Sequence, residues 1–170
     1  RALTQYGVQM LGHQVDFLPI GKKGADFLRK KGYNIVFDGS DLFDHLSFES
    51  VSSISSIIMR LFIEEEYDQV DLIYNRFKNA GTQILTEEQF LPIEIDKLKE
   101  ESESSAYTDY IFEPSKEYIV QELIPRSLRL QFYKAILDSH ASEHGARMTA
   151  MHKATDNASE LLKELSLQFN

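Results

Sequence analysis

The strongest pattern in the sequence is a regular spacing of small or apolar residues over residues 141–170. The spacing alternates between three and four positions, as the a and d positions of a left-handed coiled coil do. Because small and polar residues make up much of this seam, we expect a helix that packs closely on a second helix, as a shaft does. An amphipathic helix packed on its own domain would show the same periodicity. The seam consists of Ala141, Met148, Thr155, Leu162 and Phe169 at one heptad position and His144, Met151, Ala158 and Leu165 at the other.

Ahead of this segment, helical and strand-like patterns alternate along the chain. Ser47 is placed to cap the clearest amphipathic helix, and the turn formers Asn79, Ala80 and Gly81 separate two strand-like runs as in a hairpin. The predicted helices cover residues 2–11, 21–31 and 48–66, and the predicted strands cover 13–20, 33–37, 70–77, 82–95 and 110–113.

The alternation predicts an α/β fold in which a small Rossmann-like sheet is flanked by helices and followed by a long C-terminal helix. Residues 96–105 are charged and rich in Ser, so we expect a mobile loop there. Pro125 is expected to kink the following helices or to lie in a first helical turn. We therefore expect a globular foot domain over residues 1–113 and a helical shaft segment over 114–170.

Composition narrows the possible partners and chemistry. The formal net charge of -9 opposes sequence-independent binding to nucleic acid or anionic lipid, so proteins are the expected partners. The absence of Cys from the sequence excludes thiol catalysis, disulfides and Cys-ligated zinc. No run of eighteen apolar residues is present that could span a bilayer.

The turn Gly21–Gly24 follows a predicted strand and opens a predicted helix, which is where loops that bind phosphate are found. Neither a P-loop nor a dinucleotide-binding motif is complete here, so an ordinary turn is the simpler interpretation. One alternative function uses this turn: a flavodoxin-like protein that binds a small ligand or nucleotide. The nearby basic run, which includes Lys22 and Lys23, is either a solvated helix face or a surface that docks an acidic partner.

His140 and His144 are one helical turn apart, with Glu143 between them, and could reach one metal ion. The order differs from that of a zincin helix and no third ligand is evident, so two solvated histidines are expected in place of a metal-dependent hydrolase. Asp138, Ser139 and His140 are adjacent on a helix and point in different directions, which excludes a catalytic triad among them. We expect no catalytic residue, cofactor or metal.

The segment SEHGARMTAMHKATDNASELLKELSLQFN, preceded by YIFEPS and YNRFKNAGTQ, closely resembles the gamma subunit of F-type ATP synthases. The GKKG turn is also similar, so the resemblance covers essentially the whole chain. The matching positions near the C-terminus are Ser142, Glu143, Arg147, Met148, Ala150, Met151, Ala154–Ala158, Phe169 and Asn170.

Members of this family have a long helix and a strand ahead of the position of Arg1 and continue beyond the position of Asn170 into a tip. The resemblance therefore implies that this sequence is the lower shaft and globular foot. The dithiol insert of chloroplast relatives is absent, and a bacterial or other non-photosynthetic source fits best.

The resemblance implies a rotor that couples ion flow through a membrane ring to ATP synthesis or hydrolysis, and that binds no nucleotide itself. The implied partners are the alpha and beta subunits, the epsilon subunit and the c ring, at the cytoplasmic face of the bacterial inner membrane. Glu143, Arg147 and Asp156 are expected to make contacts within the shaft or with epsilon. The expected ring-facing residues are Tyr110, Phe112 and Glu113, with Gly21, Lys22 and Lys23 added, and the expected shaft residues are Met148, Met151, Thr155, Ala158 and Leu162.

Overall fold

A computed structural model describes residues 14–93, 115 and 118–169 of the chain. The predicted helix at 2–11, the predicted loop at 96–105 and the predicted strand at 110–113 lie outside these residues. The chain forms two compact units. One contains the described residues up to Leu72 and those from Glu88 to Tyr133, and the other contains Ile73–Glu87 and the residues from Lys134 onward.

Helix α2, Lys22–Lys31, forms where the sequence predicts a short basic helix. Gly21 precedes it with a φ of 113°, and Gly32 ends it with a φ of 74° in the left-handed region, where a residue without a Cβ is favoured. Ala25 and Leu28 are its buried residues, so the helix packs along one face and leaves its lysines in solvent.

Helix α3, Phe48–Ile63, confirms the longer amphipathic prediction. The Ser47 hydroxyl accepts a hydrogen bond from the Ser50 backbone N–H at 3.2 Å, which satisfies one of the free donors at the helix start. Val51, Ile54 and Ile58 are buried at helical spacing. A 3-10 helix, η1, at Leu42–His45 precedes α3 and buries Leu42.

The predicted strands at 13–20 and 33–37 are wrong as regular strands within the described residues. A single parallel bridge joins Phe17 to Ile35. It consists of the bonds from the Phe17 N–H to the Asn34 carbonyl at 2.9 Å and from the Val36 N–H to the Phe17 carbonyl at 3.0 Å. The apolar residues that suggested a buried strand are partly exposed at Tyr33 and Val36, so burial does not impose a longer ladder here.

Strands β1, Val70–Asn79, and β2, Thr82–Leu91, form the predicted hairpin and constitute the two-stranded sheet of the described residues. The turn between them is stabilised by the Asn79 side chain, whose Oδ1 accepts from the Gly81 N–H at 3.1 Å. Phe90 and Leu91, near the end of β2, are buried.

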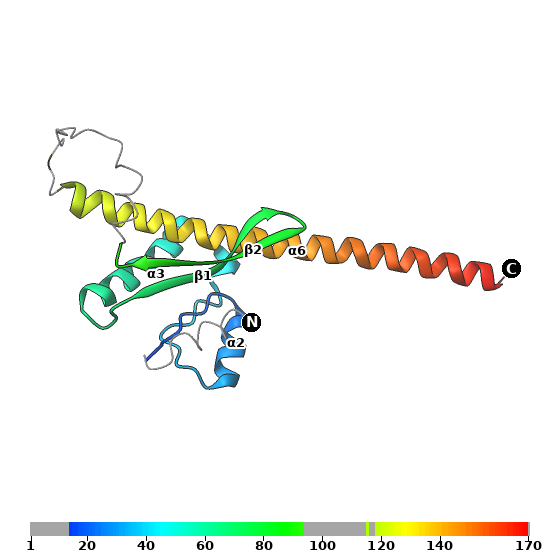
Figure 1. Cartoon of the computed structure of the whole chain (residues 1–170), viewed down its shortest axis with the longest axis horizontal. Coiled ribbons are helices and arrows are strands. Elements are labelled where there is room, and N and C mark those ends of the chain that lie inside the picture. The colour runs from blue at the N-terminus through cyan, green and yellow to red at the C-terminus, as the bar shows by residue number, and fades with distance from the viewer. Residues whose placement is uncertain (1–13, 94–114, 116–117, 170) are drawn as a thin grey trace, which may run out of the picture. The chain divides into compact units, whose positions relative to one another are not determined.

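Helix α6, Ile124–Phe169, has 46 residues and is the longest element (Figure 1). A π-helical turn, η2, at Ile119–Leu123 leads into it, and Pro125 lies in its first turn as the sequence predicts. Within the first unit, the Phe132 ring packs on Phe90 with centroids 5.8 Å apart and the Tyr133 ring on Phe48 at 5.5 Å. No helix in the described ranges combines the length and apolar character needed to cross a membrane.

Candidate functional site

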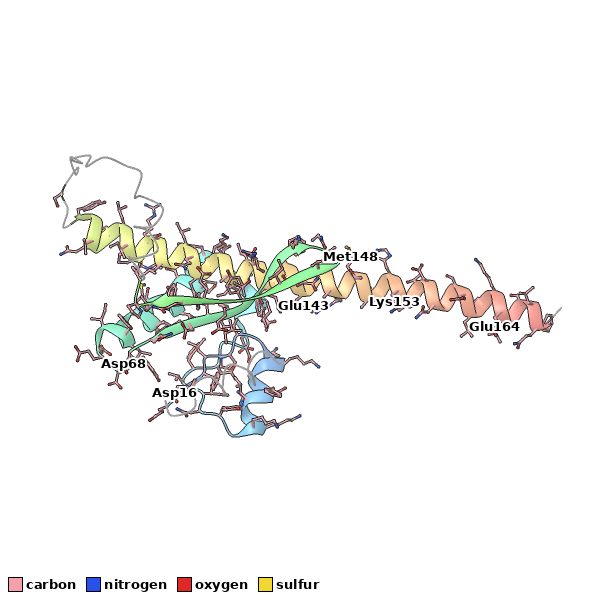
Figure 2. The ribbon with its side chains drawn as sticks, in the orientation of Figure 1. Asp16, Asp68, Glu143, Met148, Lys153 and Glu164 are labelled. Atoms are coloured by element: carbon pink, nitrogen blue, oxygen red, sulfur yellow. The ribbon has the colours of Figure 1, made fainter. Side chains whose placement is uncertain are left out.

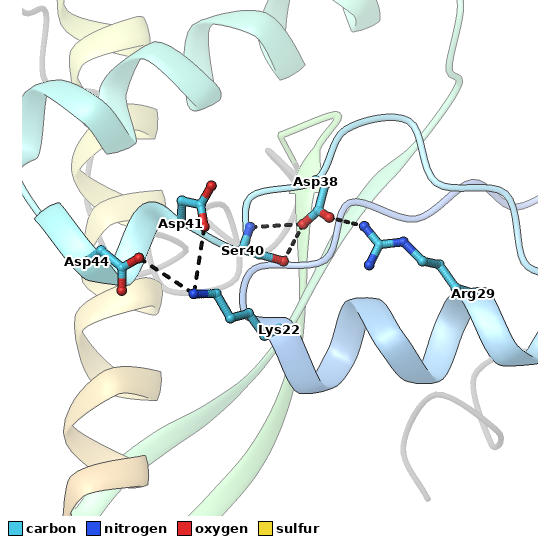
Figure 3. A network of polar contacts seen from close by, with 6 residues as sticks. All are labelled: Lys22, Arg29, Asp38, Ser40, Asp41 and Asp44. Carbon is cyan, nitrogen blue, oxygen red and sulfur yellow. Dashed lines mark hydrogen bonds and ion pairs between the residues drawn. The ribbon is translucent and has the colours of Figure 1, made fainter.

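In the turn at Gly21–Gly24, the exposed Lys22 side chain lies near two carboxylates of the protein (Figure 3). The Lys22 ammonium lies 3.9 Å from an Asp41 carboxylate oxygen and 3.7 Å from one of Asp44. Lys22 therefore joins the start of α2 to η1, and its charge is already balanced by two carboxylates. Two carboxylates beside the lysine of the turn would repel a phosphate, so this arrangement does not favour the nucleotide-binding alternative.

Asp38 makes a second set of polar contacts, in the loop that follows the bridge at Ile35. Asp38 accepts hydrogen bonds from the Ser40 hydroxyl, from the Ser40 backbone N–H at 2.9 Å and from the Arg29 guanidinium (Figure 3). The Ser40 hydroxyl is the largest cause of a lowered pKa at Asp38, and the Arg29 charge acts in the same direction. The exposed carboxylate thus stays ionised and links the loop to α2.

The predicted ring-facing residues divide into two groups. Tyr110, Phe112 and Glu113 lie outside the described residues. Gly21 and Lys22 belong to the turn, while the neighbouring Lys23 is exposed on α2. Lys22 and Lys23 are both exposed, and Lys22 differs in lying near two carboxylates.

His140 and His144 are in contact on α6. Their Nε2 atoms are 3.1 Å apart and their rings meet edge to face. Within the part of the chain that the structure describes, no group of three or more His, Cys, Asp or Glu side chains could hold a metal ion. The described residues therefore lack the third protein ligand that a catalytic zinc ion needs.

The tip of the β1–β2 hairpin lies against α6 within the second unit (Figure 1). The buried Ser142 hydroxyl donates to the Asn75 carbonyl at 2.9 Å. One turn further along the helix, a Cβ built on Gly145 would lie 3.1 Å from the Ala80 Cα. The Thr149 hydroxyl is 3.0 Å from the Ala80 carbonyl oxygen. Three positions on one face of α6 therefore hold the hairpin tip closely.

Beside this contact is an open groove of about 580 Å³. Its charged residues, Glu143 and Arg147, form an i,i+4 ion pair with each other, as the sequence predicts for a local pair. Two paired charges in an open groove do not provide a set of converging catalytic groups. The lining comprises Asn75, Gln83, Leu85, Ser142, Glu143, Ala146 and Arg147.

The C-terminal part of α6 is exposed on all sides. Each residue from Met151 to Phe169 is exposed, and the side chains labelled at Met148, Lys153 and Glu164 project away from the helix (Figure 2). Met151, Leu162 and Leu165 of the predicted seam are 63%, 65% and 52% exposed. A row of half to two-thirds exposed apolar side chains along about five helical turns is unusual for a surface that stays in water.

The chain matches known proteins along nearly its whole length. A family model described as ATP synthase matches residues 2–170. A protein of Flavobacterium johnsoniae named ATP synthase gamma chain is 57% identical over 159 residues, which cover 94% of this chain and 54% of that protein. The chain belongs to the ATP synthase gamma family. A second gamma chain, from Cytophaga hutchinsonii, is 52% identical over 158 residues, covering 93% of this chain and 54% of that protein.

This gamma-family chain thus spans about half the length of the curated relatives it matches. Solved structures agree with the fold. The central stalk and c ring of the Tetrahymena thermophila mitochondrial ATP synthase gives a TM-score of 0.57 at 26% identity, covering 82% of this chain and 60% of that chain. The rotor of the Euglena gracilis enzyme gives 0.62 at 20% identity, covering 99% and 65%. The predicted fold class, α/β with a long C-terminal helix, is confirmed.

The hairpin contact is the feature that the sequence analysis missed. The sequence feature that could have predicted this contact is Gly145, the single glycine in residues 118–169. Glycine is unfavourable in a helix interior, so an isolated glycine there indicates that another backbone approaches closely. The Ala80 backbone is that neighbour.

Proposed function

We propose that the chain is part of the rotating central stalk of a bacterial F-type ATP synthase, where it couples ion flow to ATP synthesis or hydrolysis. The observation that carries the proposal is the C-terminal part of α6, a fully exposed helix with an apolar seam, in a chain of the gamma family. A helix of 46 residues is about 70 Å long at 1.5 Å per residue, which suits a shaft between distant subunits.

In this function α6 pairs with a second helix along Met148, Met151, Thr155, Ala158 and Leu162. Pairing buries apolar side chains that are exposed in the described residues, and the resulting coiled coil resists bending more than one helix does. Because a pair of helices with different outward-facing residues is not symmetric about its axis, the shaft presents different surfaces as it turns. Rotation of an asymmetric shaft would force the surrounding catalytic subunits through different conformations.

The proposed partners follow from this placement. The alpha and beta subunits surround the shaft, epsilon binds beside it, and the c ring contacts the foot. Tyr110, Phe112 and Glu113 are the proposed ring contacts, with Gly21, Lys22 and Lys23 of the turn added. The chain itself is non-catalytic and acts as a peripheral subunit at the cytoplasmic face of the inner membrane.

Reconstitution tests this function directly. The full-length chain is mixed with the alpha and beta subunits, and ATP hydrolysis is compared with that of the same subunits without it. We expect sustained hydrolysis that requires the full-length chain, and no saturable ATP or ADP binding to the chain alone by calorimetry. Micromolar nucleotide binding that is lost on Gly24→Ala, at a position where a Cβ meets no atom within 4 Å, would instead support the flavodoxin-like alternative.

A further inference from the structure

The contact between the hairpin tip and α6 is unusual in its chemistry. Ser142, Gly145 and Thr149 lie within one narrow stripe of the helix, because steps of three and four residues return to the same face. They offer two hydroxyl groups and a bare backbone to the hairpin, and little apolar surface. Such a contact contributes little through the hydrophobic effect, but it fixes the angular position of the helix.

The two hydroxyl contacts are separated along the helix axis. The Ser142 hydroxyl donates to the Asn75 carbonyl in β1. The Thr149 hydroxyl lies 3.0 Å from the Ala80 carbonyl at the turn and 3.0 Å from the Gly145 carbonyl of its own helix, so it shares its proton between the hairpin and α6. Seven residues separate them, which is about 10 Å of helix. Attachment at two points along the axis opposes both rotation of α6 about its own axis and sliding along the hairpin.

Gly145 lies between these two points and sets the distance of approach. A Cβ at this position would lie 3.1 Å from the Ala80 Cα, 3.2 Å from the Ala80 carbonyl oxygen and 3.2 Å from the Phe77 ring. These neighbours are backbone atoms or a ring edge, and they have little freedom to move aside. A side chain at position 145 would therefore push the hairpin away from the helix.

The contact ends where the exposed part of the helix begins. Gly145 is the last buried residue of α6, and residues 146–169 are exposed. A helix that must transmit rotation from this point needs an anchor at its base, because a single helix twists and bends under load.

We propose that the hairpin tip, residues 75–80, and the α6 stripe of Ser142, Gly145 and Thr149 form a contact that carries torque between the hairpin and the shaft helix. This inference rests on the proposed rotor function and assigns positioning residues to it. The hairpin and the helix are expected to turn together as one body.

The test uses the full-length chain assembled with its ATP synthase partners in sealed vesicles. The variants are Gly145→Val, which separates the two backbones, and Ser142→Ala with Thr149→Val, which removes both hydroxyl groups at nearly constant shape. Ser159→Ala is the matched control, since the Ser159 hydroxyl donates at 3.0 Å to the carbonyl of Thr155 in its own helix. We expect less ion transport per ATP hydrolysed in the two contact variants and unchanged transport in the control.

Hydrogen exchange confirms that the variants act on the contact. Loss of one hydroxyl contact should raise amide exchange at the hairpin tip about fivefold, which corresponds to one ordinary hydrogen bond. If exchange rises as expected while ion transport per ATP stays at the wild-type value, the proposal is wrong.

A crosslink gives a result even where a variant fails to assemble. Gln83 and Ala146 line the groove beside the contact, and Gln83→Cys with Ala146→Cys leaves its two hydroxyl groups in place. The two introduced thiols are joined by a short bismaleimide after assembly, in a segment that has no Cys of its own. Because the two elements should move as one body, the crosslinked complex is expected to keep its coupled transport. Loss of transport on crosslinking would show that hairpin and helix must move apart, which overturns the proposal. Alpha and beta subunits that hydrolyse ATP at the same level with and without the chain would count against the proposed function instead.

Discussion

Leu162→Ala should have little effect on the stability of the 170-residue chain and should destabilise the helix pair of the full-length protein. Leu162 lies on the predicted seam and is 65% exposed among the described residues. In the 170-residue chain the substitution removes few contacts and introduces the best helix former, so the free energy of unfolding should change by less than about 0.5 kcal/mol. In the full-length chain the same residue should be buried against a second helix.

The size of the second effect follows from the exposure. Complete burial of a leucine side chain contributes about 1.5–3 kcal/mol relative to full exposure. About two-thirds of the side chain remains to be buried, so pairing should gain about 1–2 kcal/mol at this position. Leu162→Ala should therefore raise the equilibrium constant for separation of the paired helices about 5- to 30-fold.

Hydrogen exchange over residues 151–169, with the wild-type chain measured alongside, provides the assay. Leu161→Ala is the matched control, because Leu161 is next to the seam position and is 57% exposed. It should leave exchange in the full-length chain within about twofold of the wild type. Equal effects of the two substitutions in the full-length chain would refute the predicted seam, and so would strong destabilisation of the 170-residue chain by Leu162→Ala.

Three further predictions concern the globular part. Ser55→Ala should leave stability unchanged or raise it by about 1 kcal/mol in chemical unfolding, because the fully buried Ser55 hydroxyl has no hydrogen-bond partner among the described residues; a loss of 1 kcal/mol or more would contradict this. Tyr67→Phe should lower the unfolding temperature, because the Tyr67 hydroxyl donates a hydrogen bond to Asp16 at 2.9 Å. Burial of the phenol is the largest cause of a raised pKa at Tyr67, and the bond to Asp16 adds to it. The stabilisation from Tyr67 is therefore complete below pH 10 and is lost as the pH rises through the raised pKa. The lowered pKa of Asp38 means that its contribution with Arg29 is complete above pH 3.8 and is lost as the pH falls further, so Asp38→Asn should flatten the acid limb of a stability titration, and an unchanged limb would refute this assignment.

Elements with a strong local signal could be predicted from the sequence. The capping residue Ser47 and the spacing of Val51, Ile54 and Ile58 gave α3, and the turn at Asn79–Gly81 gave the hairpin. In each case the determining residues are within a few positions of one another. Local sequence is then sufficient, because capping, periodicity and turn chemistry all act over that range.

Features that depend on distant residues could not be predicted in the same way. The apolar runs at 14–20 and 33–37 gave a single bridge, because the sequence does not specify how many residues of two separate segments will pair. The two carboxylates that neutralise Lys22 are about twenty positions away, so the basic turn could be read as an anion site. The approach of Ala80 to Gly145 joins residues 65 positions apart, and only the isolated glycine hints at it.

Rotation of the full-length chain inside an assembled head of alpha and beta subunits is the most direct measurement. A fluorescent bead attached to the globular part would report movement while ATP is hydrolysed. We predict stepwise rotation in one direction that requires ATP and slows as ATP is depleted. ATP hydrolysis at the normal rate with a stationary bead, in complexes shown to contain the intact chain, would contradict a rotor function.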